Sequence, residues 1–251
     1  MFNLNDGILV SLYPNGVLTP IFNAYLIIGT ILIIAVGYLL GSVNSSIIIS
    51  KLLYHDDIRR HGSGNAGTTN MLRTYGKFAA LLTLLGDIAK TVLAILFAAI
   101  LFGFNYVGGI STGMGLCYVA GLFTILGHIF PLYYGFKGGK GVLATATMAL
   151  VLSPVVFLIL FTLFVAIVAV SRYVSLGSVT VAVLYPIVLR GIFQVMFGDA
   201  IPGFTALSSI IAAIVIVWCH RHNLERISNR TENKISFKKK KPEEDSVQNE
   251  E

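Results

Sequence analysis

Three polar clusters in this sequence combine cations, amides, hydroxyls and glycines in patterns that suit the binding of a phosphate group. In the first cluster, residues 57–73, glycines alternate with Ser63 and Asn65. Such a stretch leaves backbone N–H groups free to turn toward an anion. Arg59 and Arg73 flank it, and a guanidinium fork suits bidentate contact with phosphate oxygens. A flexible polar loop is the simpler interpretation, but the flanking arginines favour an anion site.

The second cluster, F-K-G-G-K-G at residues 136–141, opens directly into an apolar segment. A glycine-rich turn at a helix start would present N–H donors, the positive end of the helix dipole and the charges of Lys137 and Lys140 to one ligand. The spacing and the preceding strand of a Walker A sequence are missing, which disfavours ATP hydrolysis. A helix-breaking turn that anchors positive charge at the inner membrane face would contain the same residues.

The third cluster follows the last apolar run, where His220 and Asn223 stand three residues apart and hence on one helix face. A histidine at a membrane end can be merely interfacial, but the other two clusters favour a function for this one. Ser175 adds a hydroxyl, which helix capping would explain equally well. Asp87 and Lys90 lie inside an apolar run, so they should pair with each other or face a polar cavity.

The elements that must position these clusters are membrane helices. Of the 251 residues, 55% are hydrophobic and 12% are charged, whereas soluble domains carry roughly a quarter charged residues. No Asp, Glu, Lys or Arg occurs between residues 7 and 50 or between residues 91 and 136. A soluble globular protein is therefore all but excluded. Cys117 and Cys219 have neither metal-ligand nor disulfide spacing, so we expect both to be packing residues.

The hydropathy pattern predicts six apolar segments that are long enough to cross or enter a bilayer. They are residues 24–53, 78–102, 108–127, 141–171, 173–189 and 201–219. The first lacks the preceding basic residues of a signal peptide, so we expect a retained span. The fourth is interrupted by Ser153 and Pro154, which predicts a helix stop or kink.

Lys and Arg concentrate in the connections at one end of these segments, and such loops stay on the cytoplasmic side. This predicts an outside N-terminus, a cytoplasmic C-terminus and an odd number of crossings. We predict an all-α integral membrane protein of about seven transmembrane helices, with a short hairpin as the fourth and fifth; five spans with a re-entrant loop are the alternative. Residues 1–235 would form one multi-span domain, with 1–23 an extracellular N-terminal segment and 236–251 a charged, disordered cytoplasmic tail.

Three anion-suited clusters at one membrane face imply a phosphorylated, water-soluble ligand, and the apolar bundle suggests a lipid as the other reactant. An enzyme that joins a phosphorylated headgroup to a lipid chain competes with a transporter for an organic phosphate. A transporter would show internal repeats and binding residues near the bilayer midplane. No repeat is found, and apart from Asp87 and Lys90 the polar residues lie at the cytoplasmic ends, which favours the enzyme. A lipid-binding scaffold with a decayed site is a third interpretation.

The residues D-I-R-R-H-G-S-G-N-A-G-T-T-N at 57–70, G-H-I-F-P at 127–131 with the 136–141 cluster, and H-R-H-N at 220–223 resemble the three motifs of the bacterial acyl-phosphate:glycerol-3-phosphate acyltransferase family, PlsY. The resemblance spans residues 37–235, in order and with similar spacing. It implies a multi-pass plasma (inner) membrane enzyme whose active site faces the cytoplasm. Such an enzyme transfers a fatty acyl group from acyl phosphate to the sn-1 hydroxyl of glycerol 3-phosphate, which gives lysophosphatidic acid and phosphate in the first step of phospholipid synthesis.

The resemblance also implies the site residues and partners. The expected catalytic residues are His220, Asn223, Ser63 and Ser175, and the expected substrate-binding residues are Arg59, Asn65, Thr69, Asn70, Arg73, Lys137, Gly138, Gly139, Lys140 and Gly141. We expect no cofactor, no metal and no nucleic acid, and a chain that functions as a monomer among membrane lipids. Thr68 stands where the family usually has Ala, and Gly141-Val142-Leu143-Ala144-Thr145 carries one residue more than the family's G-V-A-T.

The chemistry leaves the route of the proton open. His220 could orient or deprotonate the attacking hydroxyl, or a substrate phosphate could accept its proton; an acyl-enzyme on Ser63 is the covalent alternative. The other known class of glycerol-phosphate acyltransferases uses an H-x-x-x-x-D pair, and none of the five histidines has an Asp at that spacing. Its absence favours acyl phosphate over acyl-CoA as the donor.

Overall fold

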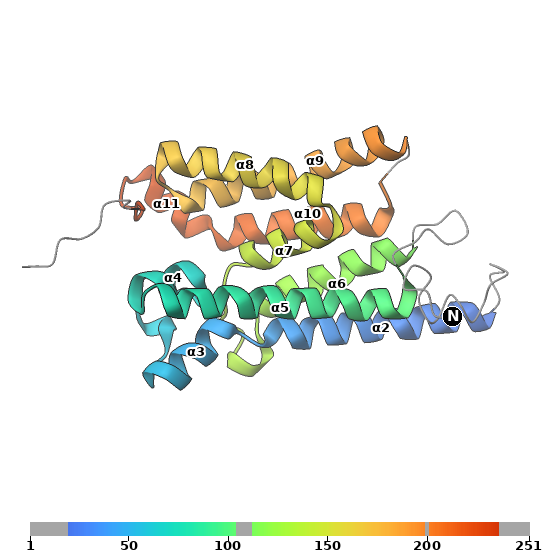
Figure 1. Cartoon of the computed structure of the whole chain (residues 1–251), viewed down its shortest axis with the longest axis horizontal. Coiled ribbons are helices and arrows are strands. Elements are labelled where there is room, and N and C mark those ends of the chain that lie inside the picture. Colours follow the sequence, from blue (N-terminus) through green and yellow to red (C-terminus); the bar gives the residue numbers. More distant parts are fainter. Residues whose placement is uncertain (1–19, 104–111, 199–200, 236–251) are drawn as a thin grey trace, which may run out of the picture.

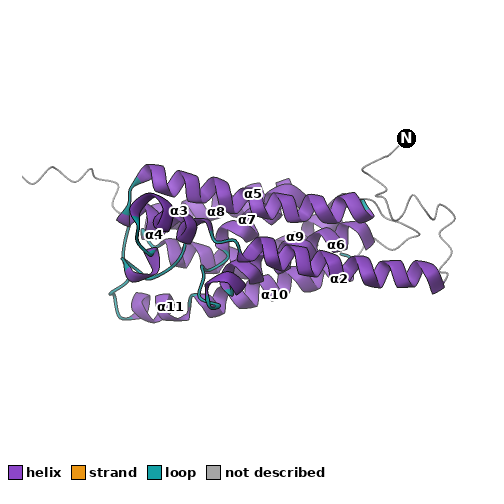
Figure 2. Cartoon of the chain, turned by 90° about the horizontal axis from the view of Figure 1, so that it is seen from below, coloured by secondary structure: helices purple, strands orange, loops and turns teal. Residues whose placement is uncertain are grey.

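The computed structural model describes residues 20–103, 112–198 and 201–235, and every regular element within these ranges is a helix. The long helices lie side by side along one axis, and the short helices at residues 45–54, 68–74 and 221–228 gather at one end (Figures 1 and 2). The helices are α2 Pro20–Ser42, α3 Ser45–Tyr54, α4 Thr68–Thr74, α5 Lys77–Phe102, α6 Thr112–Ile129, α7 Val142–Leu152, α8 Pro154–Ser171, α9 Val174–Phe197, α10 Gly203–Cys219 and α11 Arg221–Ser228. Two 3-10 turns, Ile58–Arg60 and Leu132–Tyr134, lie in the connections.

Several of these helices are membrane-type. The segments long and apolar enough to cross a membrane are Ala24–Tyr54, Lys77–Phe102, Gly113–Tyr134, Pro154–Ser171 and Val174–Met196. Helices α10 and α11 together form a further candidate that is bent by 51°, and α7 is a shorter apolar helix. The side chains of Val170 and Val195 are 89% and 83% exposed, as expected of a surface that faces hydrocarbon. The prediction of an all-helical membrane protein is confirmed.

The hairpin predicted for residues 141–171 has its turn at Ser153. Helix α7 ends at Leu152, and α8 begins at Pro154, where the fixed φ of proline suits the first helical position. Helix α8 then runs back along α7 (Figure 1). The two arms have 11 and 18 residues rather than equal lengths. The hydroxyl groups of Tyr118 and Ser153 lie 2.6 Å apart, which gives the turn a polar contact with α6.

Two of the predicted segments differ clearly from the helices of the structure. The segment predicted for 24–53 is divided into α2 and α3, because the Asn44 side chain accepts a hydrogen bond from the Ile47 N–H at 3.2 Å and so starts a new helix. The segment predicted to end at residue 189 continues as α9 to Phe197. The exposed Arg190 does not end it, since a long side chain can reach away from the helix.

Close contact between α2 and α6 fixes the end of the bundle where the polar clusters lie. A Cβ atom at Gly41 would lie 2.8 Å from the Cα of Thr124, and one at Gly127 would lie 2.9 Å from the backbone nitrogen of Ser42. Only glycine lets the two backbones approach this closely, as is common between membrane helices. The ends of α2 and α6 are therefore held together directly beside the loop that follows α6.

Candidate active site

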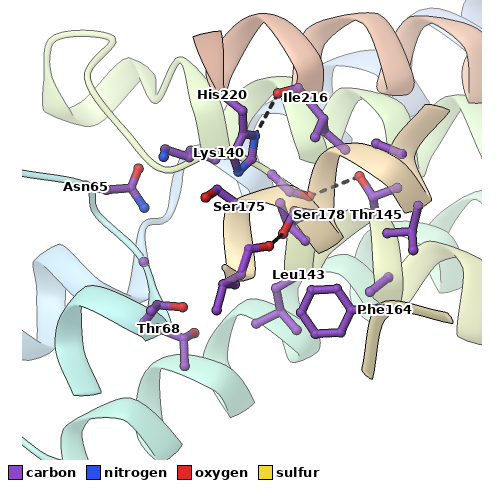
Figure 3. Close-up of a pocket in the computed structure, with 18 of the residues that line it drawn as sticks. Asn65, Thr68, Lys140, Leu143, Thr145, Phe164, Ser175, Ser178, Ile216 and His220 are labelled. Carbon is purple, nitrogen blue, oxygen red and sulfur yellow. Dashed lines mark hydrogen bonds between the residues drawn. The ribbon is translucent and has the colours of Figure 1, made fainter. Parts of the chain in front are cut away.

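A cavity of about 410 Å³ lies at the end of the bundle that contains α4 and α11. In Figure 3, His220, Lys140 and Ser175 lie on one side of it, and Leu143 and Phe164 on the other. Its lining is thus polar near the helix ends and apolar between α7, α8 and α9. The apolar part includes Ala146, Ala149, Phe157, Leu160, Phe161, Phe164, Val181 and Tyr185. The cavity can therefore hold a polar headgroup and an apolar chain together.

Most of the predicted site residues line this cavity, and they come from all three polar clusters. They are Ser63, Asn65, Thr69, Asn70, Arg73, Lys140, Gly141, Ser175, His220 and Asn223. The predicted residues outside the lining are Arg59, Lys137, Gly138 and Gly139. The lining residues that the sequence did not assign to the site include Asp87, His128, Arg226 and Glu232.

Asn70 shapes the first loop from within. It is 2% exposed, and its Oδ1 atom accepts a hydrogen bond from the Ser63 N–H at 3.0 Å. Its Nδ2 atom donates to the carbonyl oxygens of His61 and Asn65, at 2.9 and 3.1 Å. These bonds close the loop around one side chain and place Ser63 and Asn65 at the cavity. The predicted contact of Asn70 with substrate stays a prediction, because its amide is already engaged with the loop.

Arg59 joins the first loop to the second. Its guanidinium pairs with Asp57 at 2.7 Å and donates to the carbonyl oxygens of Tyr134 and Lys137, at 2.9 and 3.1 Å. The hydrogen bond from Arg59 outweighs the effect of burial and lowers the pKa of Asp57 below its usual value, so the pair stays charged. The structure thus places Arg59 between the loops, and its predicted contact with substrate stays untested.

The lysine-glycine loop, residues 136–141, folds back onto the end of α6. The N–H groups of Gly138 and Gly139 donate to the carbonyl oxygens of Ile129 and His128, at 3.1 and 3.0 Å. These carbonyls lie at a helix end, where intrahelical donors are missing. The two N–H groups expected to face a ligand are therefore engaged with α6. Helix α7 begins after Gly141, and the Thr145 N–H donates to the Gly141 carbonyl oxygen. The N–H groups of the residues between them belong to the first turn of the helix, where intrahelical acceptors are missing. The start of α7 is therefore the part of the loop suited to an anion.

Lys140 is held in the cavity by the third cluster. Its Nζ atom donates a hydrogen bond to the Oδ1 atom of Asn223, which is 7% exposed. Burial lowers the pKa of Lys140 to about 8, although the nearby carboxylate of Glu232 opposes this shift. The ammonium is thus a partly desolvated charge, which interacts more strongly with a phosphate than a solvated one would.

Glu232 connects several predicted site residues. Its Oε1 atom accepts hydrogen bonds from Ser175 and Asn223, at 2.8 and 2.7 Å, and its Oε2 atom accepts one from Arg226 at 2.7 Å. Burial opposes its ionisation, but these three hydrogen bonds outweigh burial and the pKa of Glu232 lies below its usual value. In the sequence, Glu232 is one of two acids within a basic cluster, which did not reveal its partners.

His220 presents one ring nitrogen to the cavity. The side chain is buried, and Nδ1 lies 2.8 Å from the carbonyl oxygen of Ile216 (Figure 3). Because a carbonyl can only accept, Nδ1 of the neutral ring carries the proton and Nε2 keeps its lone pair. A histidine held in this tautomer can accept a proton from a hydroxyl group at Nε2. Within the described ranges, no group of three or more His, Cys, Asp or Glu side chains is arranged to hold a metal ion.

Comparisons with known proteins identify the family of this chain. The family model described as Glycerol-3-phosphate acyltransferase matches residues 31–230. Glycerol-3-phosphate acyltransferases of Syntrophomonas wolfei and Mycoplasmopsis agalactiae are 40% and 38% identical to this chain; the alignments cover 80% and 86% of this chain and 94% and 98% of the relatives.

Solved structures are similar as well. The glycerol 3-phosphate form of PlsY, an integral membrane glycerol 3-phosphate acyltransferase, is 30% identical with a TM-score of 0.71, and the match covers 82% of this chain and 96% of that chain. Its lysophosphatidic acid form is 29% identical with a TM-score of 0.69, and the match covers 82% of this chain and 95% of that one. The enzyme interpretation is thereby favoured over the transporter. The chain belongs to the glycerol-3-phosphate acyltransferase family and is a membrane acyltransferase of the PlsY type.

Proposed function

We propose that this acyltransferase takes its acyl group from acyl phosphate and delivers it to the sn-1 hydroxyl of glycerol 3-phosphate, which gives lysophosphatidic acid and inorganic phosphate. The observation that carries the proposal is the cavity, in which Lys140, Asn223 and His220 lie next to an apolar space between α7, α8 and α9. A phosphorylated headgroup and a fatty chain fit these two parts. This would be the first step of phospholipid synthesis.

In the proposed reaction, the sn-1 oxygen attacks the acyl carbonyl carbon and the bond from that carbon to the phosphate oxygen breaks. Acyl phosphate is already activated, so the protein must mainly orient the reactants and stabilise charge on the leaving phosphate. Lys140 and Arg73 both line the cavity. Lys140 would hold the phosphate of glycerol 3-phosphate, and Arg73 would supply positive charge toward the leaving phosphate. The start of α7 adds backbone donors to the same region.

The hydroxyl proton moves to His220 Nε2 in the route that is favoured by the tautomer inferred from the contact with Ile216. Transfer of the proton to a phosphate oxygen of the substrate is the alternative, and it needs no protein base. A covalent route through Ser63 would leave a labelled protein after incubation with acyl phosphate alone. The Ser63 side chain lies in an exposed loop, where no base is bonded to its hydroxyl among the described hydrogen bonds, which disfavours this route.

The proposed orientation in the membrane is based on the loops that are rich in Lys and Arg, because such loops stay on the cytoplasmic side. Helices α2, α5, α6, α7, α8, α9 and α10 would be the seven crossing segments, with the α7–α8 hairpin as the fourth and fifth. The end that contains α4 and α11 would face the cytoplasm of the plasma (inner) membrane, with the N-terminus outside. Residues 1–235 would act as one domain and as a monomer. The predicted extracellular segment 1–23 and tail 236–251 lie largely or wholly outside the described residues.

The test is an assay of the purified protein in detergent with labelled glycerol 3-phosphate. Palmitoyl phosphate and palmitoyl-CoA are compared as donors, and lysophosphatidic acid, its sn-1 or sn-2 position, and released phosphate are measured. We expect sn-1 product from palmitoyl phosphate and loss of activity in Lys140→Ala. Lys77→Ala is the matched control, since Lys77 is at the same end of the bundle but outside the cavity lining. Equal turnover with palmitoyl-CoA would refute the proposed donor.

A further inference from the structure

A second ionic cluster lies beside the lysine-glycine loop and takes no part in the chemistry described so far. Asp87, Lys90 and His128 are 1%, 4% and 5% exposed. Lys90 Nζ lies 2.9 Å from Asp87 Oδ1 and 3.0 Å from His128 Nδ1. Ser45 Oγ donates to the same Asp87 oxygen at 3.0 Å. The cluster therefore joins α5 to α3 and α6 inside the bundle, where charges must be paired.

Lys90 also binds the end of α2. Its Nζ atom donates to the carbonyl oxygens of Gly41 and Val43, at 3.0 and 2.8 Å. These carbonyls lie at the break between α2 and α3, where intrahelical donors are missing and the helix dipole favours a cation. One ammonium thus holds both the broken first span and the His128 ring.

The bond from Lys90 also sets the tautomer of His128. An ammonium has no acceptor atom, so Nδ1 must accept and the proton of the neutral ring sits on Nε2. Nε2 faces the backbone of Gly139: a Cβ atom there would overlap Nε2 and would lie 2.6 Å from the carbonyl oxygen of Ala66. The first loop and the lysine-glycine loop therefore meet at this ring.

The loop backbone is bonded to the same place. The N–H of Gly139 donates to the His128 carbonyl oxygen at 3.0 Å. Gly139 directly precedes Lys140, whose ammonium reaches Asn223 in the cavity. A displacement of Gly139 would consequently move Lys140 away from Asn223.

We infer that His128 is a positioning residue: Lys90 and Asp87 hold its ring, the ring supports Gly139, and this support places Lys140 for glycerol 3-phosphate. The inference rests on the proposed function, since it concerns how that substrate is bound. Loss of an interaction that is equally strong in the substrate complex and in the transition state raises KM without a matching loss of kcat. Loss of the His128 ring should therefore affect KM more than kcat.

The test uses the purified full chain with palmitoyl phosphate and varied glycerol 3-phosphate. We expect His128→Ala to raise the KM for glycerol 3-phosphate by at least about tenfold while kcat changes less than about threefold. His128→Gln should recover most of the lost affinity, because its side chain is long enough to fill the space beside Gly139 that Nε2 occupies. Thr124→Val is the matched control: Thr124 is buried one turn earlier in α6, and its hydroxyl bonds the Ala120 carbonyl oxygen at 2.9 Å.

A double-mutant cycle tests the contact with Gly139 directly. Gly139→Ala should raise KM in the wild-type background and should raise it by a smaller factor in His128→Ala, because the clash of the added methyl group with the ring is gone while its clash with the Ala66 carbonyl oxygen remains. If His128→Ala is not recovered as folded protein, His128→Asn replaces it; Asn keeps a polar group near Lys90 and empties the space beside Gly139.

Some outcomes would overturn the inference. A fall in kcat with unchanged KM and no rescue by Gln would make His128 part of the reacting machinery. Wild-type values of both constants in His128→Ala, or additive penalties in the cycle, would show that the ring does not support the loop. Absence of product from the wild-type chain would instead refute the proposed function, so the two failures are distinguishable.

Discussion

Two ionic networks lie in this bundle, one around Lys90 and one around Lys140, and they differ in how firmly they are enclosed. Lys90 is surrounded by α2, α5 and α6, and its partners include two backbone carbonyls that cannot move away. Lys140 bonds a side chain of α11 at the cavity, and that network ends at Arg226, whose side chain is 42% exposed. The first network has fixed partners, whereas the second can exchange a partner for substrate.

The comparison shows that buried charge serves two purposes in one membrane protein. Enclosed charges are stable only when their partners are fixed, so they hold helices and loops in place. Charges at a cavity keep part of their interaction energy available for a ligand. Changes in the Lys90 network should therefore reduce stability and substrate affinity, and changes at the cavity should reduce turnover.

The largest expected effect is at His220 on the cavity side. His220→Gln should lower kcat by about 10²-fold to 10⁴-fold, because a positioned general base contributes that much. Steady-state kinetics at matched protein level measure it, and His222→Gln is the control, since His222 is exposed on α11. A loss smaller than about tenfold would favour proton transfer to a substrate phosphate.

Lys90→Met tests the enclosed network. It should lower the free energy of unfolding by about 3–5 kcal/mol, because it leaves the charge of Asp87 buried without its lysine partner. Denaturant unfolding in detergent measures the change, and the double variant Asp87→Asn with Lys90→Met should recover part of it. A change below about 1 kcal/mol in Lys90→Met, as for a surface pair, would show that the network is not enclosed in the membrane protein.

Glu232→Gln should have a moderate effect at the cavity. It weakens a hydrogen bond to the charged Arg226, and such bonds are worth about 1.5–3 kcal/mol, so kcat/KM at pH 7 should fall about tenfold or more. Burial lowers the pKa of Lys140 to about 8, and the carboxylate of Glu232 opposes this shift. Lys140 must be charged to hold a phosphate, so wild-type activity should decline as the pH rises through about 8. Without the carboxylate the ammonium loses its proton at lower pH, so the decline should shift to lower pH. An unchanged pH profile would contradict the coupling.

The smallest effect is expected at Thr68, which lines the cavity. Its Oγ1 atom is buried, and the described part of the chain provides it with no hydrogen-bond partner. Thr68→Ala should therefore leave the free energy of unfolding unchanged or raise it by up to about 1 kcal/mol, with kcat/KM within about twofold. A clear rise in the KM for either substrate would instead show that this hydroxyl contacts a ligand.

The sequence predicts the helices of this protein better than their ends. Apolar runs without charge are sufficient to predict the spans, and Pro154 predicts the turn of the hairpin because its ring suits only the start of α8. The break at Asn44 was not predicted, because it depends on one capping bond and on the carbonyl oxygens to which Lys90 donates hydrogen bonds. Periodicity carries no signal for contacts between distant segments.

The same limit applies to the site. Motif order predicts that Lys140, His220 and Asn223 come together, and the cavity contains all three. The roles of individual groups depend on the other end of each hydrogen bond: the amide of Asn70 bonds its own loop, and Glu232 bonds Ser175 from 57 residues away. Such pairings follow from tertiary packing, and a single sequence contains no direct record of them.

Helix α7 has 11 residues, which corresponds to a length of about 16 Å, against about 30 Å for the hydrocarbon core of a bilayer. In the proposed arrangement α7 nevertheless crosses the membrane, so the bilayer around its end at Ser153, which contacts Tyr118, must be locally thinner. A segment this short creates hydrophobic mismatch, which thinner bilayers reduce. In vesicles of defined lipid length, turnover should consequently depend on bilayer thickness. The lipid composition of the membrane that receives the product would then affect the rate at which the product is made.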